Sequence, residues 1–175
     1  MTTTEQTTFL PAGYELKINN GGNYLKIQDG ETIKIRVLTN SILGYEYFRQ
    51  TSDGTAKPVR QKEPFNWTPT DSRDGKSPKE FWAFVVYNYN IKAIQIWEVT
   101  QQSIKNDIFA LYKDADFGDP KSYDLKISRT GKELDTTYTI MPLNKTPFED
   151  AEIIKKAKGV RLEALYDGDD PFKPF

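Results

Sequence analysis

The sequence contains no cysteine and no histidine among its 175 residues. These two absences exclude disulfide bonds, thiol nucleophiles, serine–histidine triads and the usual zinc ligands. The lack of cysteine also suits a reducing compartment. We therefore expect a protein that is not an enzyme and that needs neither a metal ion nor another cofactor.

Long apolar runs and an excess of one charge are also missing. No stretch approaches the roughly eighteen apolar residues of a membrane span. The start, MTTTEQTTF, lacks the basic and apolar regions of a signal peptide, so we expect no membrane partner. The 24 basic side chains are matched by 25 acidic ones, so net charge provides no bulk attraction to nucleic acid.

Charge is nevertheless distributed unevenly, and aromatic residues are abundant. Residues 36–62 carry five basic side chains against two acidic ones, whereas the last ten residues carry three acidic side chains against one lysine. Tyr, Phe and Trp make up 13% of the chain. Such an asymmetry between a basic middle and an acidic end is typical of proteins that bind charged partners.

Residues 81–112 form the densest core-building stretch of the chain. β-branched and aromatic residues fill 81–87 and 92–99, and the asparagines between them suit a turn, which predicts an antiparallel hairpin. The apolar period then changes to that of one helix face, which predicts a helix over residues 100–115. This helix face consists of Ile104, Ile108, Leu111 and Tyr112.

Three further strands are predicted from alternation of apolar and polar residues. Residues 32–38 alternate, with Ile33 inward and Lys34 and Arg36 on a basic outer face. Two more strands follow the helix at 123–128 and 136–141. At this length one domain is the best expectation.

The predicted order is a strand, a long loop over 39–80, two strands, a helix and two strands. This order matches a mainly β, five-stranded Greek-key barrel of the OB type, with the helix between strands three and four. We assign residues 24–165 to this domain, 1–23 to an N-terminal arm and 166–175 to a flexible, disordered acidic tail. In OB folds, the face of strands two and three and the loops after strands one and four bind oligonucleotides or oligosaccharides.

Basic and aromatic side chains fall on those binding elements. Single-stranded nucleic acid needs cations for its phosphates and flat rings for its bases. The candidate DNA-binding residues are Lys34, Arg36, Tyr45, Tyr47, Arg49, Lys57, Arg60, Lys62, Trp67, Tyr87, Trp97, Arg129 and Lys132. On strand 92–99, Ile94 and Ile96 are expected inward, which places Gln95 and Trp97 outward. Both faces of 81–87 are apolar, and we place Tyr87 outward.

The alternative for these residues is structural. Tyrosines and tryptophans could complete the core, and the cations could simply solvate a loop. A metal-dependent nuclease is less favoured, because the carboxylates at 114–119 lack the spacing of a calcium loop and suit a solvated loop.

The acidic end is predicted to bind partners. An acidic peptide that ends in Phe can dock its ring in a pocket, or compete with DNA for the basic groove. The candidate residues are Asp167, Asp169, Asp170, Pro171, Phe172 and Phe175. The plain alternative is an inert, solubilising end.

Five segments, taken in order, resemble the single-stranded DNA-binding proteins of tailed bacteriophages. These segments are IKIRVL at 33–38, GYEY at 44–47, KPVR at 57–60, FWAF at 81–84 and the run 97–111. The end of the chain, DDPF followed by PF, is similar to the acidic Pro-Phe tip of bacterial and phage single-stranded DNA-binding proteins, although Lys173 departs from that tip.

This resemblance implies an OB fold and sequence-independent coating of single strands in phage replication, recombination and repair. It also implies recruitment of replication or recombination enzymes through the tail, in the cytoplasm of an infected bacterial host. We expect a monomer, or weak self-association on DNA. The rival hypothesis is a β module that binds carbohydrate or protein, such as a virion component, because exposed aromatic rings also stack on sugars.

Overall fold

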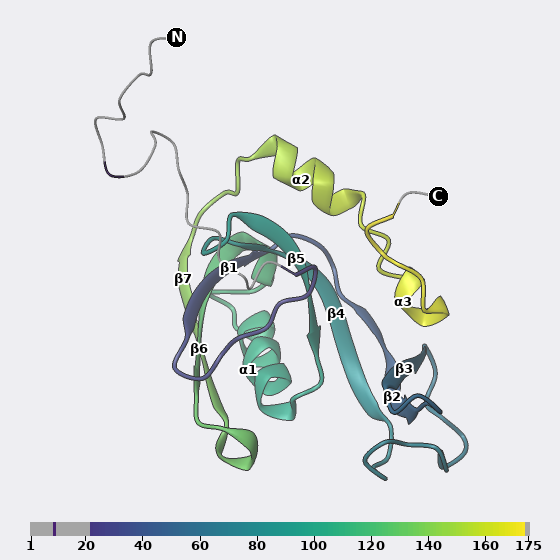
Figure 1. Cartoon of the computed structure of the whole chain (residues 1–175). Coiled ribbons are helices and arrows are strands. Elements are labelled where there is room, and N and C mark those ends of the chain that lie inside the picture. The colour runs from purple at the N-terminus through teal and green to yellow at the C-terminus, as the bar shows by residue number, and fades with distance from the viewer. Residues whose placement is uncertain (1–8, 10–21, 174–175) are drawn as a thin grey trace.

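The computed structural model describes residue 9 and residues 22–173 (Figure 1). Its strands are β1 (Thr32–Val37), β2 (Ile42–Gln50), β3 (Ala56–Gln61), β4 (Lys79–Asn88), β5 (Ala93–Val99), β6 (Tyr123–Thr130) and β7 (Thr137–Lys145). Its helices are α1 (Gln102–Lys113), α2 (Ala151–Lys158) and α3 (Ala164–Asp167), with 3-10 turns at Pro120–Ser122 and Glu133–Asp135. Most of the predicted N-terminal arm lies outside the described residues.

The seven strands form one open, antiparallel sheet with β4 at its centre. The order is β3-β2-β4-β1-β6-β7, and β5 pairs with the other edge of β4. The first half of β4 pairs with β2, as in Gly44 opposite Phe81, and its last residues pair with β1, as in Val37 opposite Val86. One long apolar strand therefore joins two parts of the fold: the β2–β3 hairpin and the strands β1, β6 and β7.

The first core lies between the concave face of the sheet and α1. Alternate residues of β1, Ile33, Ile35 and Val37, point to this side and meet Ile104 and Ile108 of the helix. These two isoleucines are four residues apart, so they share one face of α1. In Figure 1 the helix lies between β6–β7 on one side and β4–β5 on the other.

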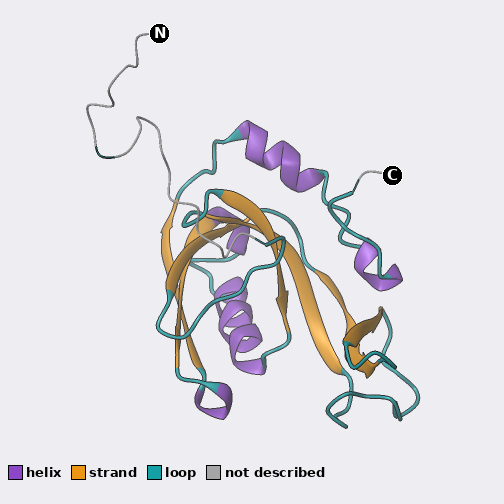
Figure 2. Cartoon of the chain, viewed as in Figure 1, coloured by secondary structure: helices purple, strands orange, loops and turns teal. Residues whose placement is uncertain are grey.

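The second core covers the opposite face of β4 and β5. Phe81, Ala83 and Val85 pack there against Ala157 of α2 and Leu165 of α3. Figure 2 shows α2 and α3 on the outside of the sheet, away from α1. A strand covered on both faces carries apolar residues at consecutive positions, which is why the two faces of 81–87 look alike in the sequence.

Residues 22–30 run along the free edge of β5 and on to β6. The amide of Ile96 donates to the carbonyl of Asn23 and the amide of Leu25 donates back to Ile96, each at 2.8 Å. The amide of Gly30 then donates to the carbonyl of Arg129 at 2.8 Å. Residues 23–25 therefore occupy the free edge of β5, which is the edge that β7 would have to pair with in order to close the sheet.

The predicted mainly β class is confirmed, and α1 lies between β5 and β6 as expected. The closed five-stranded barrel is not confirmed, because the sheet has seven strands and the described residues include no pairing between β5 and β7. The predicted long loop over 39–80 is wrong in part, because it contains β2 and β3. Pro58 is tolerated in β3 because this strand lies at the edge of the sheet.

The chain after β7 folds back over the sheet rather than forming a disordered tail. Pro171 is buried, and Phe172 packs against the second core. The hydroxyl of Tyr166 donates to the carbonyl of Leu43, and Arg161 Nε donates to the carbonyl of Lys173 at 2.9 Å. The prediction of disorder is therefore wrong for residues 166–173, and Phe175 lies outside the described residues.

None of the helices in the described ranges is both long and apolar enough to cross a membrane.

Candidate functional site

One face of the β2–β3 hairpin gathers aromatic and basic side chains. Tyr45, Tyr47 and Arg49 alternate along β2, so they share a face, and Arg49 lies directly opposite Lys57 of β3. Phe65 and Trp67 of the following loop join this face. We call these six residues the hairpin surface: Tyr45, Tyr47, Arg49, Lys57, Phe65 and Trp67.

The rings of the hairpin surface form a chain of contacts. The ring centroids of Tyr47 and Phe65 are 5.4 Å apart, and those of Phe65 and Trp67 are 4.9 Å apart, both with edge-to-face geometry. Edge-to-face pairs contribute about 0.5–1.5 kcal/mol each beyond burial. Trp67 is still 52% exposed. The rings are therefore fixed by one another while a large aromatic face remains open to solvent.

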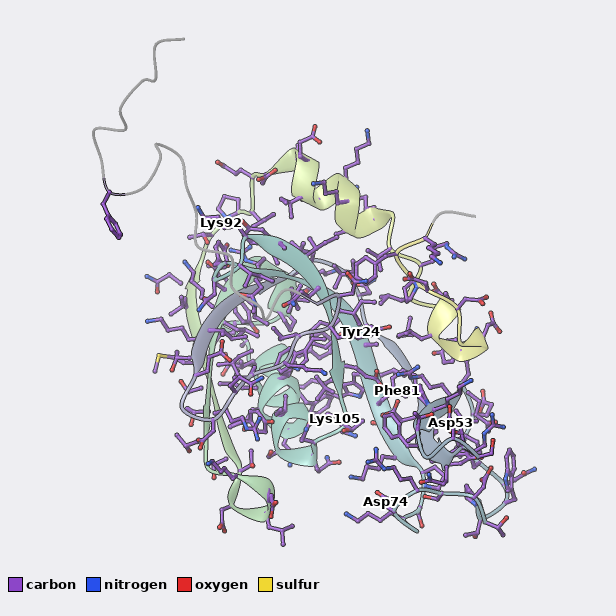
Figure 3. The ribbon with its side chains drawn as sticks, viewed as in Figure 1. Tyr24, Asp53, Asp74, Phe81, Lys92 and Lys105 are labelled. Atoms are coloured by element: carbon purple, nitrogen blue, oxygen red, sulfur yellow. The ribbon has the colours of Figure 1, made fainter. Side chains whose placement is uncertain are left out.

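The loop that carries these rings is itself held against β2. The amide of Gln50 donates to the carbonyl of Asp71, and the amide of Arg73 donates to the carbonyl of Phe48, both at 2.8 Å. Asp53, labelled in Figure 3, accepts hydrogen bonds from Thr51 and Thr55 at the hairpin turn, and these bonds lower the pKa of its carboxyl. Both loops beside the surface therefore have defined hydrogen bonds.

One carboxylate lies close to the cations of the hairpin surface, that of Asp71, which accepts from the Tyr47 hydroxyl. Arg49 and Lys57 are exposed and form no ion pair with any residue in the described part of the chain. Like charges directly opposite on paired strands are destabilising. The pKa of Tyr47 is raised by burial and by its hydrogen bond to Asp71, so this phenol is neutral. The arrangement suits an anionic ligand that also offers flat rings.

Arg36 lies on the outer face of β1, as predicted, but it is only 1% exposed. Its Nε donates to Asp124 Oδ1 at 2.7 Å, and Nη1 and Nη2 donate to the carbonyls of Lys121 and Thr146. Phe148 covers it from the segment after β7, with the guanidinium 5.9 Å from the ring centroid. The prediction that Arg36 reaches phosphates is therefore wrong, because all three guanidinium nitrogens already donate hydrogen bonds within the protein.

Arg60 is also enclosed. It lies on the opposite face of the hairpin, 3.0 Å from Glu46 Oε2 and 2.8 Å from Glu98 Oε2. Burial raises the pKa of Glu46 to about 8, helped by its hydrogen bond to Glu98 and opposed by Arg60. The predicted contact between Arg60 and DNA is therefore replaced by an ion pair that ties the hairpin to β5.

Trp97 belongs to the first core, so its predicted outward position is wrong. It is 4% exposed and packs edge-to-face on Phe84 with centroids 5.6 Å apart. Gln95, on the same face, is 1% exposed. Ile94 and Ile96 do face the other way, but α2 and α3 cover that side. Both faces of β5 are buried, and alternation could not reveal which of them faces α1.

The remaining candidates are scattered over the molecule. Tyr87 does lie on the outer face, but it packs on Tyr89 and Phe148, with centroids 4.9 and 5.5 Å away. Lys34 is 3.5 Å from Asp124 and 4.4 Å from the Tyr89 ring centroid. Neither side chain reaches the hairpin surface.

Three further cations lie elsewhere. Arg129 Nη1 donates to the carbonyl of Ile27 at 2.7 Å, and this bond holds residues 22–30 against β6. Lys132 is exposed in the loop between β6 and β7, which lies far from the β2–β3 hairpin (Figure 1). Lys62 lies 5.5 Å from the ring centroid of Tyr166, near the C-terminal segment.

The acidic tail residues are partly accessible. Asp167, Asp169 and Asp170 are exposed, and Asp170 accepts from the amide of Phe172 at 2.9 Å. The sequence interpretation missed Phe65, although Phe65 and Trp67 occur close together in a proline-rich loop. It also assigned Tyr112 to the buried face of α1, where it is instead 54% exposed.

Comparison with known proteins assigns the chain to no family. No protein-family model, no curated protein and no solved structure matches the chain. The hairpin surface is therefore the evidence from which a function is inferred.

The Glu46 carboxyl predicts a pH dependence of stability. Its pKa rises from 4.5 to about 8 on folding, so the native state keeps a proton that the unfolded state releases. The free energy of unfolding should therefore fall as pH rises through this window, by up to about 1.4 kcal/mol per pH unit. Urea unfolding at pH 6 and pH 7.5 should show a loss of about 2 kcal/mol that Glu46→Gln removes.

The control for this measurement is Glu63→Gln, which changes an exposed carboxylate after β3. This variant should keep the pH dependence of the wild type. An unchanged pH dependence in Glu46→Gln would show that Glu46 ionises normally in the native state.

Proposed function

We propose that the protein binds single-stranded DNA without sequence selectivity, through the hairpin surface. One observation carries the proposal: Tyr47, Phe65 and the exposed ring of Trp67 share one face with Arg49 and Lys57, two cations that form no ion pair within the described residues. Stacking on aromatic rings tolerates any base, because every base has a flat face. Cations next to the rings suit the phosphates that accompany each base.

The same features favour single strands over other ligands. A duplex hides the faces of its bases, so exposed rings find no stacking partner there. A neutral oligosaccharide could stack on the rings but would leave Arg49 and Lys57 without a counter-charge. These two adjacent cations therefore favour a polyanion over a sugar as the ligand.

An OB-type architecture is part of the proposal. The pairings of β1 with β4 and β6, of β4 with β5 and of β6 with β7, with α1 between β5 and β6, support it. In this interpretation the β2–β3 hairpin is an insertion after the first strand, which is a ligand-binding loop in OB folds.

The proposed role is non-enzymatic coating of exposed strands during phage replication, recombination or repair in the host cytoplasm. Recruitment of partner enzymes would use the exposed Asp167, Asp169 and Asp170. Affinity would come from phosphate contacts and stacking, so it should depend steeply on salt.

The test measures fluorescence anisotropy of labelled oligo-dT, oligo-rU and duplex DNA at two salt concentrations. Oligo-dT should bind much more tightly than duplex, and its affinity should fall as salt rises. Trp67→Ala should cost about 1–3 kcal/mol of binding to oligo-dT, with little change in the salt slope, because a stacking contact releases no counterion.

Phe48→Ala is the matched control, since Phe48 is 46% exposed on the opposite face of the same hairpin. It should leave the affinity for oligo-dT unchanged. Equal affinity for duplex and oligo-dT, or equal losses from the two variants, would contradict the proposal. Capture of neutral oligosaccharide without capture of DNA would favour the rival carbohydrate-binding function.

A further inference from the structure

A cavity of about 640 Å³ opens between α1, the first half of β4 and the turn between β1 and β2. We call it the α1 cavity. Its volume lies within the range of small-molecule sites, about 300–1,000 Å³. The residues that matter for its chemistry are Asn40, Leu43, Trp82, Phe109, Tyr112 and Lys121.

One wall is the indole of Trp82, which is held in place by a polar network. Trp82 Nε1 donates to Glu80 Oε1 at 3.2 Å. Lys105 Nζ lies 3.4 Å from the same oxygen and donates to the Glu80 carbonyl at 3.1 Å. Lys105, labelled on α1 in Figure 3, is 5% exposed, so this buried ammonium ties the helix to β4. The indole is thereby fixed before any ligand arrives.

The other wall carries two aromatic side chains that add little to the core. Phe109 and Tyr112 of α1 line the cavity yet are 51% and 54% exposed. They are three residues apart, so they share a helix face. The ammonium of Lys113 lies 5.6 Å from both ring centroids. Exposed rings that surround a cavity and carry a cation are suited to an aromatic, anionic ligand.

The cavity lies on the same face of the sheet as the hairpin surface. Leu43 lines the cavity opposite Trp82, and Tyr45 and Tyr47 follow on the same face of β2. At the other side Lys121 Nζ donates to Asn40 Oδ1 and lies 3.6 Å from Asp119. A strand bound along the hairpin surface would therefore reach the cavity after Tyr45.

We propose that the α1 cavity takes one unstacked base of the single strand that the hairpin surface binds. The base lies between Trp82 and the rings of Phe109 and Tyr112, and Lys113 and Lys121 lie near its phosphates. The inference rests on the proposed function and extends it to a second site. The two carboxylates that line the cavity, Glu80 and Asp119, each lie beside a lysine, Lys105 at 3.4 Å and Lys121 at 3.6 Å. The aromatic walls and the continuity with the hairpin surface favour a base over an apolar peptide side chain.

The first measurement is oligo-dT affinity of the Phe109→Ala/Tyr112→Ala variant of the full chain. Both residues are half-exposed, so the fold is retained, which circular dichroism checks. Affinity should fall about ten-fold, the effect of losing a base stack. Met141→Ala is the matched control, because Met141 is 54% exposed on β7, away from the cavity. It should bind as the wild type does.

The second measurement follows the Trp82 indole itself. A Trp67→Phe background removes the exposed indole of the hairpin surface and leaves Trp82 and the buried Trp97. Saturating oligo-dT should quench emission in this background, and adding Trp82→Phe should abolish the quench. An oligomer of abasic deoxyribose phosphate has the same backbone without bases, and it should cause no quench.

The outcomes separate this inference from the proposed function. If oligo-dT fails to bind the wild-type protein, the proposed function fails and the inference fails with it. If oligo-dT binds, but the double variant keeps full affinity and Trp82 emission is unchanged, the inference alone is overturned. An acidic peptide that ends in Phe is measured beside oligo-dT. The inference is also overturned if the double variant loses affinity for this peptide and keeps its affinity for oligo-dT, because the occupant of the cavity is then a peptide side chain.

Discussion

Arg36→Met should destabilise the protein by about 3 kcal/mol, although the sequence suggests a surface cation. The substitution removes the 2.7 Å ion pair with Asp124 and leaves that carboxylate in a buried position. Breaking a buried pair costs roughly 3–5 kcal/mol. The lower end is expected because Lys34 and the hydroxyl of Tyr89 still contact Asp124, at 3.5 and 2.9 Å.

Urea unfolding followed by tryptophan fluorescence measures this change. Lys126→Met is the control, because Lys126 is an exposed cation directly opposite Lys34 on the same face. It should change the free energy of unfolding by less than about 0.5 kcal/mol. If Arg36→Met keeps the stability of the wild type and binds DNA more weakly, the prediction is contradicted and Arg36 contacts DNA.

Local periodicity predicted the central elements well. The expected strands at 81–87 and 92–99 correspond to β4 and β5, and the helix expected over 100–115 corresponds to α1. The alternation of residues 32–38 correctly placed Ile33 in the first core. These elements depend on contacts with near neighbours, and their side-chain period is visible in a short window.

Burial of the outer face could not be predicted in the same way. The group that covers Arg36 includes Thr146, 110 residues further along the chain. Alternation shows which residues share a face, but it does not show what covers that face. The same limit explains the C-terminal segment, whose acidic composition suggested disorder while Leu162, Leu165 and Phe172 provided an apolar face for β4.

The candidate site shows the same division. Tyr45, Tyr47 and Arg49 were predicted as binding residues, and they share one face of β2 because a strand has a period of two. Arg60 was grouped with them by charge alone, whereas its parity on β3 places it opposite Glu46 on the other face. The α1 cavity could not be predicted, because it forms only where α1 meets β4.

Trp97→Ala should destabilise the protein by about 3–5 kcal/mol, the usual cost of removing a buried tryptophan from a core. The indole packs against Phe84 and is 4% exposed, so its removal leaves a cavity beside α1. The folded fraction should bind oligo-dT with unchanged affinity, because no part of this ring reaches the hairpin surface. Thermal unfolding and anisotropy on the same samples measure both effects.

Two variants keep this prediction testable. Trp97→Phe retains most of the core volume, so it should fold and bind oligo-dT normally even if Trp97→Ala does not fold. Trp67→Ala should show the reverse pattern, with weaker binding and a loss of only about 1 kcal/mol in the free energy of unfolding, which is the contact with Phe65. A well-folded Trp97→Phe protein that loses affinity for oligo-dT would place the indole at the DNA, against its burial beside Phe84.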